Sequence, residues 1–134
     1  DRVNEEINLN EFEAYETQSD FNNNVNNKAR NAEVGMTSIY DGRGGHLCID
    51  GNESTHCHTD KSGSARQGII FQVRMNSLYG IVIKNRKGDY GARIIDNVIS
   101  AIGSGFAATY KFTSQRDTYR LRVNHDSGTM TLIT

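Results

Sequence analysis

Three consecutive runs at the carboxyl end of the chain, within residues 106–134, alternate apolar residues with polar or small ones. Their apolar positions are Phe106, Ala108, Tyr110, Phe112, Tyr119, Leu121, Val123, Met130 and Leu132. Side chains of a β-strand point alternately to opposite faces, so a period of two indicates strands with one buried face. The turn-forming residues 124–128 separate the last two runs. This stretch therefore predicts consecutive antiparallel strands.

Further strand patterns lie upstream of this stretch. Residues 69–75 and 79–84 alternate in the same way, and residues 36–40 and 46–50 are shorter apolar runs. Residues 90–102 place apolar side chains at helical spacing, but these are nearly all β-branched, which favours a strand. About seven short strands at regular spacing predict a mainly β protein, an antiparallel β-sandwich or barrel.

The amino-terminal segment differs from the rest in charge. Residues 1–34 carry eight acidic and three basic side chains, whereas residues 35–134 carry eight acidic and twelve basic ones. Either the acidic segment lies on a basic surface of its own domain, or a basic face is left for phosphate, sulfated glycan or nucleic acid. We expect an acidic amino-terminal arm at 1–34 with its first dozen residues mobile, followed by an antiparallel β domain at 35–134.

A short helix is predicted near residues 17–33. Phe21, Val25 and Ala29 fall at helical spacing, and Ser19 or Asp20 would cap the amino end. Five asparagines within residues 22–27 oppose a long helix, because asparagine side chains compete for the backbone hydrogen bonds.

The length of 134 residues suits one domain, and the mean hydropathy of −0.62 describes a polar chain. No apolar run approaches the roughly 20 residues of a membrane-spanning helix, so no membrane span is expected. The sequence begins with Asp1 rather than methionine, as a secreted protein would after removal of a leader. We therefore expect a secreted protein, extracellular or at the cell surface.

Cys48 and Cys57 are the only cysteines, with eight residues between them. An even count in a chain that looks processed suggests a disulfide. The alternative is a metal site, because His46, His56, His58 and Asp60 lie close to the two cysteines in sequence. This spacing does not match the paired ligands of structural zinc sites, although His56 and His58 share one face of an extended segment. The disulfide interpretation needs no cofactor.

Two loops are the predicted contact surfaces. Residues 53–64 are polar and rich in turn formers, and residues 85–89 form a basic hairpin tip. The candidate binding residues in and around these loops are Lys61, Arg66, Lys84, Arg86, Lys87, Asp89 and Tyr90.

A ribonuclease is the catalytic alternative. Cleavage of RNA needs a general base and cations that stabilise a phosphorane. Lys111, Arg120 and Arg122 oppose the apolar alternation, which predicts one basic sheet face, and His125 lies at the adjoining turn. A helix followed by a basic antiparallel sheet with a terminal histidine is the general plan of small microbial ribonuclease toxins. An ordinary solvated strand face has the same composition, and no nucleophile elbow or phosphate-binding loop occurs in the chain.

Residues 44–52, the polar loop up to residues 66–68 and the strands after it resemble small secreted β-sandwich virulence proteins of enteric bacteria. The two types are the Yersinia pseudotuberculosis-derived mitogen and the dispersins. The resemblance covers mainly residues 42–90 and implies a disulfide-containing, signal-processed sandwich with a non-enzymatic surface or receptor-binding role. The chain departs from these proteins in its closely spaced cysteines and its acidic amino-terminal segment.

These observations order three hypotheses. The first is a secreted, non-enzymatic binding protein, a bacterial surface or virulence factor that engages a protein or glycan on a host or other cell. The second is a toxin-like ribonuclease with nucleic acid as its partner. The third is a structural subunit of a pilus or coat, a homo-oligomer in which residues 1–34 pack against a neighbouring copy.

Overall fold

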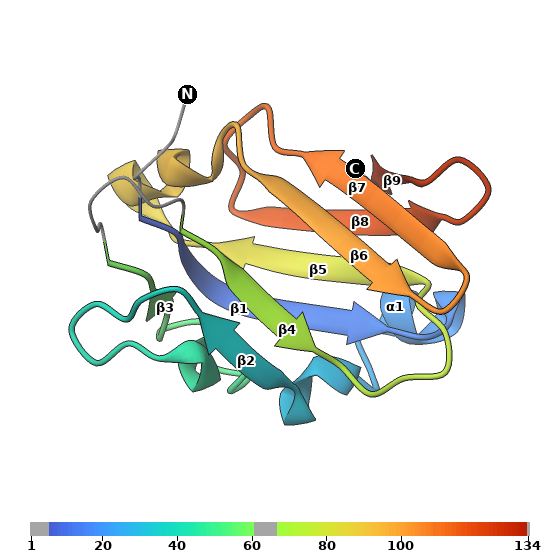
Figure 1. The fold of residues 1–134 in the computed structure, drawn as a ribbon, viewed down its shortest axis with the longest axis horizontal. Coiled ribbons are helices and arrows are strands. Elements are labelled where there is room, and N and C mark those ends of the chain that lie inside the picture. Colours follow the sequence, from blue (N-terminus) through green and yellow to red (C-terminus); the bar gives the residue numbers. More distant parts are fainter. Residues whose placement is uncertain (1–5, 61–66, 134) are drawn as a thin grey trace.

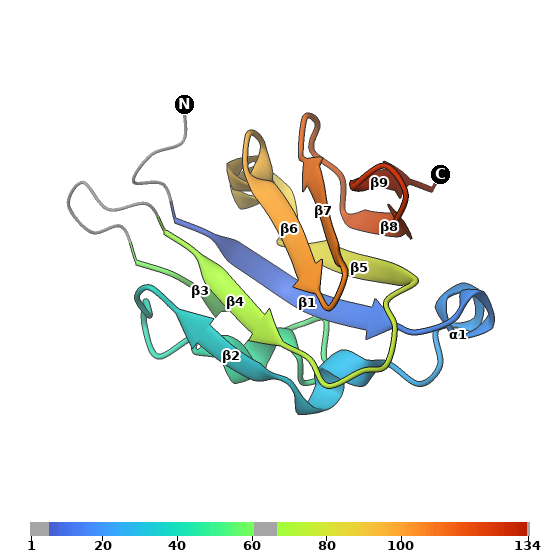
Figure 2. The ribbon, with the colours of Figure 1, turned by 45° about the vertical axis from the view of Figure 1, so that its right-hand side comes forward.

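The computed structural model describes residues 6–60 and 67–133, and it confirms the mainly β fold. A seven-stranded sheet curls into a half-barrel, and a two-stranded sheet packs beside it (Figures 1 and 2). The large sheet contains β1 (Asn8–Tyr15), β3 (Cys57–His58), β5 (Gly80–Asn85), β6 (Val98–Gly103), β7 (Phe106–Lys111), β8 (Thr118–Asn124) and β9 (Thr129–Leu132). The small sheet contains β2 (Glu33–Met36) and β4 (Ile69–Gln72).

The helical segments are all short. They are α1 (Gln18–Asn23) and the 3₁₀ segments η1 (Lys28–Asn31), η2 (Gly45–Cys48) and η3 (Gly88–Ile94). None of the helices in the described part of the chain is both long and apolar enough to cross a membrane.

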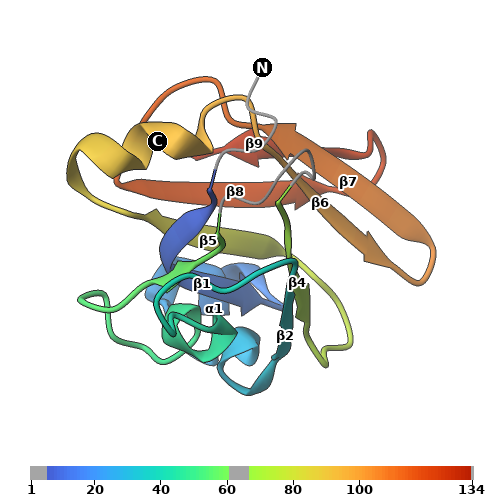
Figure 3. The same cartoon turned by 60° about the vertical axis from the view of Figure 1, so that its left-hand side comes forward.

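The strand order of the large sheet is β3-β1-β5-β8-β9-β7-β6. The pairs are antiparallel, as predicted, except that β9 runs parallel to β7 where Thr129 pairs with Thr109. The parallel pair arises because β9 inserts between β8 and β7 after the tight turn at residues 124–128. Figure 3 shows the resulting curl of the sheet from its side.

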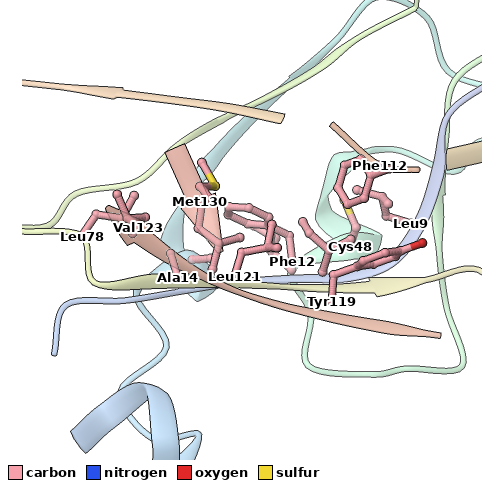
Figure 4. Packing of buried hydrophobic residues seen from close by; sticks show 14 of the residues in the cluster. Leu9, Phe12, Ala14, Cys48, Leu78, Phe112, Tyr119, Leu121, Val123 and Met130 are labelled. Carbon is pink, nitrogen blue, oxygen red and sulfur yellow. The ribbon is translucent and has the colours of Figure 1, made fainter. Parts of the chain in front are cut away.

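The core fills the concave side of the curled sheet. Tyr119 and Leu121 of β8 are fully buried, and Val123 and Met130 continue the same apolar layer (Figure 4). The small sheet closes this core, because Phe71 of β4 stacks on Phe12 of β1 with ring centroids 4.0 Å apart. The alternation at the carboxyl end thus predicted both the strands and their buried face.

The expectation of a mobile amino-terminal arm is wrong from residue 8 onward. Residues 8–15 form β1, which lies between β3 and β5 in the large sheet. Leu9, Phe12 and Ala14 face the core, but Asn10 and Glu11 between them are also buried, and Glu11 bonds Gly51 in the loop that follows η2. A β-bulge between Leu9 and Glu11 shifts the register. The bulge breaks the period of two, so the sequence pattern concealed this strand.

The predicted helix near 17–33 is two separate turns. Thr17 caps α1 by accepting a hydrogen bond from the Asp20 N–H, so the cap precedes the two predicted positions. Asn24 ends α1 in the left-handed conformation with φ of 55°. Such a φ is tolerated by asparagine, which explains why an asparagine-rich segment breaks the helix.

Three other predictions change in detail. Residues 46–50 are not a strand, because η2 occupies 45–48. The basic segment 85–89 is not a hairpin tip, since β5 pairs with β1 and β8 and the chain leaves it through η3. The predicted strand at 90–102 is correct only for its second half, where β6 begins at Val98.

Candidate functional site

The Cys48–Cys57 disulfide, predicted from the sequence, is present. The two Cα atoms lie 5.1 Å apart and both side chains are fully buried. Cys57 belongs to β3 and pairs with Leu9 of β1, so the bridge fixes the loop 49–56 against the large sheet. This places His56 and His58 at the end of the sheet where β1 starts and β5 ends (left in Figure 1).

Three polar side chains form a row across neighbouring strands at this end. Asn8 of β1 lies directly opposite His58 of β3, and directly opposed residues share a face of the sheet. On the other side Leu9 pairs with Asn85, so Arg86, the next residue after β5, follows on the face that Asn8 shares. Asn8 is therefore the centre of the row His58–Asn8–Arg86.

The segment η3 adds two further groups to this row. The guanidinium groups of Arg86 and Arg93 lie 4.3 and 4.5 Å from the ring centroid of Tyr90. Arg93 Nη1 lies 3.4 Å from His58 Nε2, and a guanidinium can only donate, so Nε2 is the acceptor. The proton of a neutral His58 is therefore on Nδ1, which donates to the Thr59 carbonyl at 2.6 Å. Both ring nitrogens of His58 are thus engaged.

The positive charges around the row lower the pKa values of its histidines and arginines. Burial, Arg86, Arg43 and His58 lower the pKa of His56 to about 4. Burial and the positive charges of Arg86 and Arg93 also lower the pKa of His58, although its bond to Thr59 opposes them. Burial, then Arg93 and Arg43, hold the pKa of Arg86 below its ordinary value. Both imidazoles are consequently neutral at pH 7.

Few negative charges balance these cations. Among residues 6–60 and 67–133, the only carboxylate ion-paired with Arg43, Arg86 or Arg93 is that of Glu6, 3.9 Å from Arg93 Nε. Tyr40 packs against His58 with ring centroids 4.8 Å apart, and Tyr40 and Tyr90 are each 49% exposed. We call this group the cationic end, and its members are Asn8, Tyr40, Arg43, His56, His58, Arg86, Tyr90 and Arg93. Its chemistry is that of a receptor for an anion, open to solvent beside two aromatic rings.

A buried carboxylic acid supports the loop beside the cationic end. Glu11 is 1% exposed, and its Oε2 accepts a hydrogen bond from the Gly51 N–H at 3.1 Å. Burial raises the pKa of Glu11 to about 7, with Gly51 opposing it and a hydrogen bond with Asp50 adding to it. Asp50 keeps its charge, because bonds from Thr55 and Asn52 outweigh its burial and lower its pKa. Glu11 is therefore the more readily protonated of the two carboxyl groups.

The predicted binding residues divide into several groups. Arg86 and Tyr90 belong to the cationic end, whereas Lys87 and Asp89 are exposed beside it. Lys84 lies 3.3 Å from Glu13 and 3.5 Å from Glu53. Burial lowers its pKa, but the two carboxylates outweigh burial and hold the pKa above its ordinary value. Lys61 and Arg66 lie outside the described residues.

The residues of the metal alternative do not gather around one point. The rings of His56 and His58 are 5.8 Å apart, but His46 is exposed on η2 and both cysteines are in the disulfide. Within residues 6–60 and 67–133, no three histidine, cysteine, aspartate or glutamate side chains are arranged to hold a metal ion. Asp60 follows β3 and its backbone N–H bonds the Ser38 hydroxyl.

Two residues of the ribonuclease alternative, Arg120 and His125, hold other parts of the fold in place. Arg120 donates to Asn24 Oδ1 at 2.8 Å and its guanidinium lies 4.3 Å from the Phe21 ring centroid, so it secures the end of α1. His125 bonds the Leu78 carbonyl through Nε2 at 2.8 Å. Arg122 shares a face of β8 with Arg120, but Lys111 is on β7, and β9 separates these two strands. The structure does not assemble a catalytic group from these four.

Sequence reasoning missed Asn8, Tyr40, Arg43 and Arg93 as site residues. Nothing in their local sequence marks them, because Asn8 lies in a polar segment and Arg43 in a glycine-rich turn. They meet the two histidines only because β3, β1 and β5 are neighbours and η3 folds beside them.

The chain was also compared with known proteins. No protein-family model, no curated protein and no solved structure matches it.

Proposed function

We propose that the protein is a secreted, non-enzymatic binding protein that engages a sulfated or otherwise acidic glycan on a cell surface through the cationic end. One observation carries this proposal. Arg43, Arg86 and Arg93 surround two neutral histidines, and the sole carboxylate paired with any of them among the described residues is Glu6. The disulfide is compatible with an extracellular location, where such glycans occur.

The chemistry of the side chains favours an acidic sugar. The planar fork of an arginine donates two parallel hydrogen bonds to a sulfate or carboxylate, and arginine is less strongly hydrated than lysine. The half-exposed ring of Tyr40 offers an apolar surface next to these donors, as amphipathic aromatic side chains do at interfaces. Together they suit a ligand that has both a charged group and a carbohydrate ring.

The same geometry favours binding over catalysis. A general acid must hold a proton at the working pH, and the pKa of His56 is about 4. His58 has both ring nitrogens bonded within the protein. In the unliganded protein, neither imidazole is therefore free to donate a proton to a leaving group at neutral pH.

The test compares retention on an immobilised sulfated polysaccharide at pH 7.4. We expect the wild type to be retained, and R86Q/R93Q to bind about 100-fold more weakly, because each charge-assisted hydrogen bond contributes about 1.5–3 kcal/mol. The matched control is K111Q/R122Q, which removes two exposed charges from β7 and β8. This control should elute at nearly the wild-type salt concentration.

Two results would defeat the proposal. One is a wild-type protein that the sulfated polysaccharide does not retain at low ionic strength. The other is an equal loss of retention in both double variants, because binding would then depend on net charge and not on the cationic end.

A further inference from the structure

The centre of the cationic end contains an unsatisfied polar group. Asn8 is 4% exposed, and among the residues that the structure describes neither its amide nitrogen nor its oxygen has a hydrogen-bond partner. Burial without a partner costs roughly 1–3 kcal/mol, so native structures avoid such groups unless a ligand or water completes them. An apolar residue would fill the same position in β1 without this cost, so the amide needs an explanation beyond stability.

The groups on either side of Asn8 indicate what would complete it. Arg86 supplies N–H donors on the β5 side, and His58 lies directly opposite on β3. The amide nitrogen of Asn8 is a second donor, and among the described residues Glu6 is the sole carboxylate ion-paired with Arg43, Arg86 or Arg93. Donors supplied from neighbouring strands suit a tetrahedral oxyanion, which has more acceptor positions than a carboxylate.

We propose that the row His58–Asn8–Arg86 is an inner subsite for a tetrahedral oxyanion, a sulfate ester or phosphate monoester, which is bound together with a proton. The inference rests on the proposed function and specifies the group that the cationic end recognises. The Asn8 amide and Arg86 donate to the oxyanion. The proton goes to His56, whose imidazole then becomes a donor as well, because both ring nitrogens of His58 are already bonded.

The proton is coupled to the anion by the surrounding charges. Arg43, Arg86 and Arg93 face the two imidazoles from the loop before η2, the end of β5 and η3. Glu6 is the carboxylate whose charge opposes the effect of these arginines at His58, and it is ion-paired with Arg93. Without a ligand the guanidinium groups oppose protonation of the histidines, and a bound dianion removes this repulsion. Anion affinity should therefore rise as the pH falls.

The experiment follows the ring resonances of the four histidines by NMR while the full chain is titrated with sodium sulfate at constant ionic strength. We expect saturable shifts at His56 and His58, with His46 and His125 as internal controls outside the row. The sulfate Kd should be at least about tenfold smaller at pH 5.5 than at pH 7.5, because binding takes up a proton. Sulfate stays fully ionised in this range, so the pH effect belongs to the protein.

Parallel titrations with inorganic phosphate and acetate distinguish the anion classes. Phosphate should compete with sulfate, whereas acetate should bind at least about tenfold more weakly, since it lacks the third and fourth oxygen. In N8V the sulfate Kd should rise about tenfold, because one hydrogen bond to a charged group is lost. N8S keeps a short polar group, should bind with intermediate strength, and replaces N8V if that variant does not fold.

Three results would overturn the proposal of an inner subsite. The resonances of all four histidines could shift linearly with sulfate concentration, acetate could bind as tightly as sulfate, or N8V and N8S could bind sulfate like the wild type. Retention of the wild type on the sulfated polysaccharide together with any of these results would leave the proposed function standing. Failure of that retention would instead defeat the proposed function itself.

Discussion

Replacing Glu11 with glutamine should stabilise the protein by about 3 kcal/mol at pH 8 and change its stability little at pH 4. The cause is the buried position of this carboxyl group, whose pKa is raised from 4.5 to about 7. In the unfolded chain Glu11 loses its proton near pH 4.5, whereas the folded protein retains it up to about pH 7. The free energy of unfolding therefore falls as the pH rises through this window. Glutamine reproduces the uncharged side chain, since its amide oxygen can accept from the Gly51 N–H as the Glu11 carboxyl group does.

The measurement is urea denaturation of the wild type and E11Q between pH 4 and pH 8.5. The matched control is E33Q, which removes one exposed carboxylate from β2 and should follow the wild-type curve. A constant difference between E11Q and the wild type across this range would contradict a buried, protonated Glu11.

Removing the disulfide should cost about 3 kcal/mol of unfolding free energy, the value that chain entropy predicts for a loop of this length. In C48A/C57A the loop 49–56 would no longer be closed by a covalent link between η2 and β3. Because His56 lies in that loop and His58 follows the bridged cysteine, we also expect the anion affinity of the cationic end to fall about tenfold.

Guanidinium denaturation in the presence and absence of a reductant provides the check. The reduced wild type should unfold at the same midpoint as C48A/C57A, and reductant should not affect the variant. A loss of stability without any loss of sulfate or polysaccharide binding would show that the disulfide does not position the cationic end.

The acidic segment at 1–34 illustrates what composition could and could not predict. Three of its carboxylates are paired internally, Glu6 with Arg93, Glu13 with Lys84 and Glu16 with Lys28. Glu6 and Glu13 pair with bases of residues 35–134, as predicted for an acidic segment on a basic surface of its own domain, whereas Glu16 pairs with Lys28 inside the segment. Charge counting could not reveal that Arg43 and Arg86 are left without a carboxylate partner in the described chain, because that depends on tertiary contacts.

Some strands could be predicted from the sequence and others could not. β8 was predictable because Tyr119, Leu121 and Val123 share one buried face and the residues between them are polar. β1 was not, because its polar residues are buried as well and the bulge at Leu9–Glu11 interrupts the alternation. A strand covered on both faces has no solvent-facing side to give a period of two.

The candidate site was predictable only in part for a related reason. The disulfide followed from two cysteines in a chain with a processed appearance, and the contribution of Arg86 and Tyr90 followed from a basic loop. His58 and Arg86 lie 50 and 78 positions from Asn8 in the sequence. No local sequence pattern specifies the strand order that brings these residues together. The unsatisfied amide of Asn8 is a property of packing alone.

The most direct test of the cationic end as the binding site is to map where a sulfated oligosaccharide contacts the protein. The backbone amide resonances of the ¹⁵N-labelled full chain would be followed by NMR as the oligosaccharide is added. We predict that the perturbed amides cluster at Asn8, Arg43, His56–His58 and residues 86–93, with a 1:1 saturable response. Perturbations centred on Lys111, Arg120 and Arg122, or spread evenly over the surface, would contradict the assignment of the cationic end as the binding site.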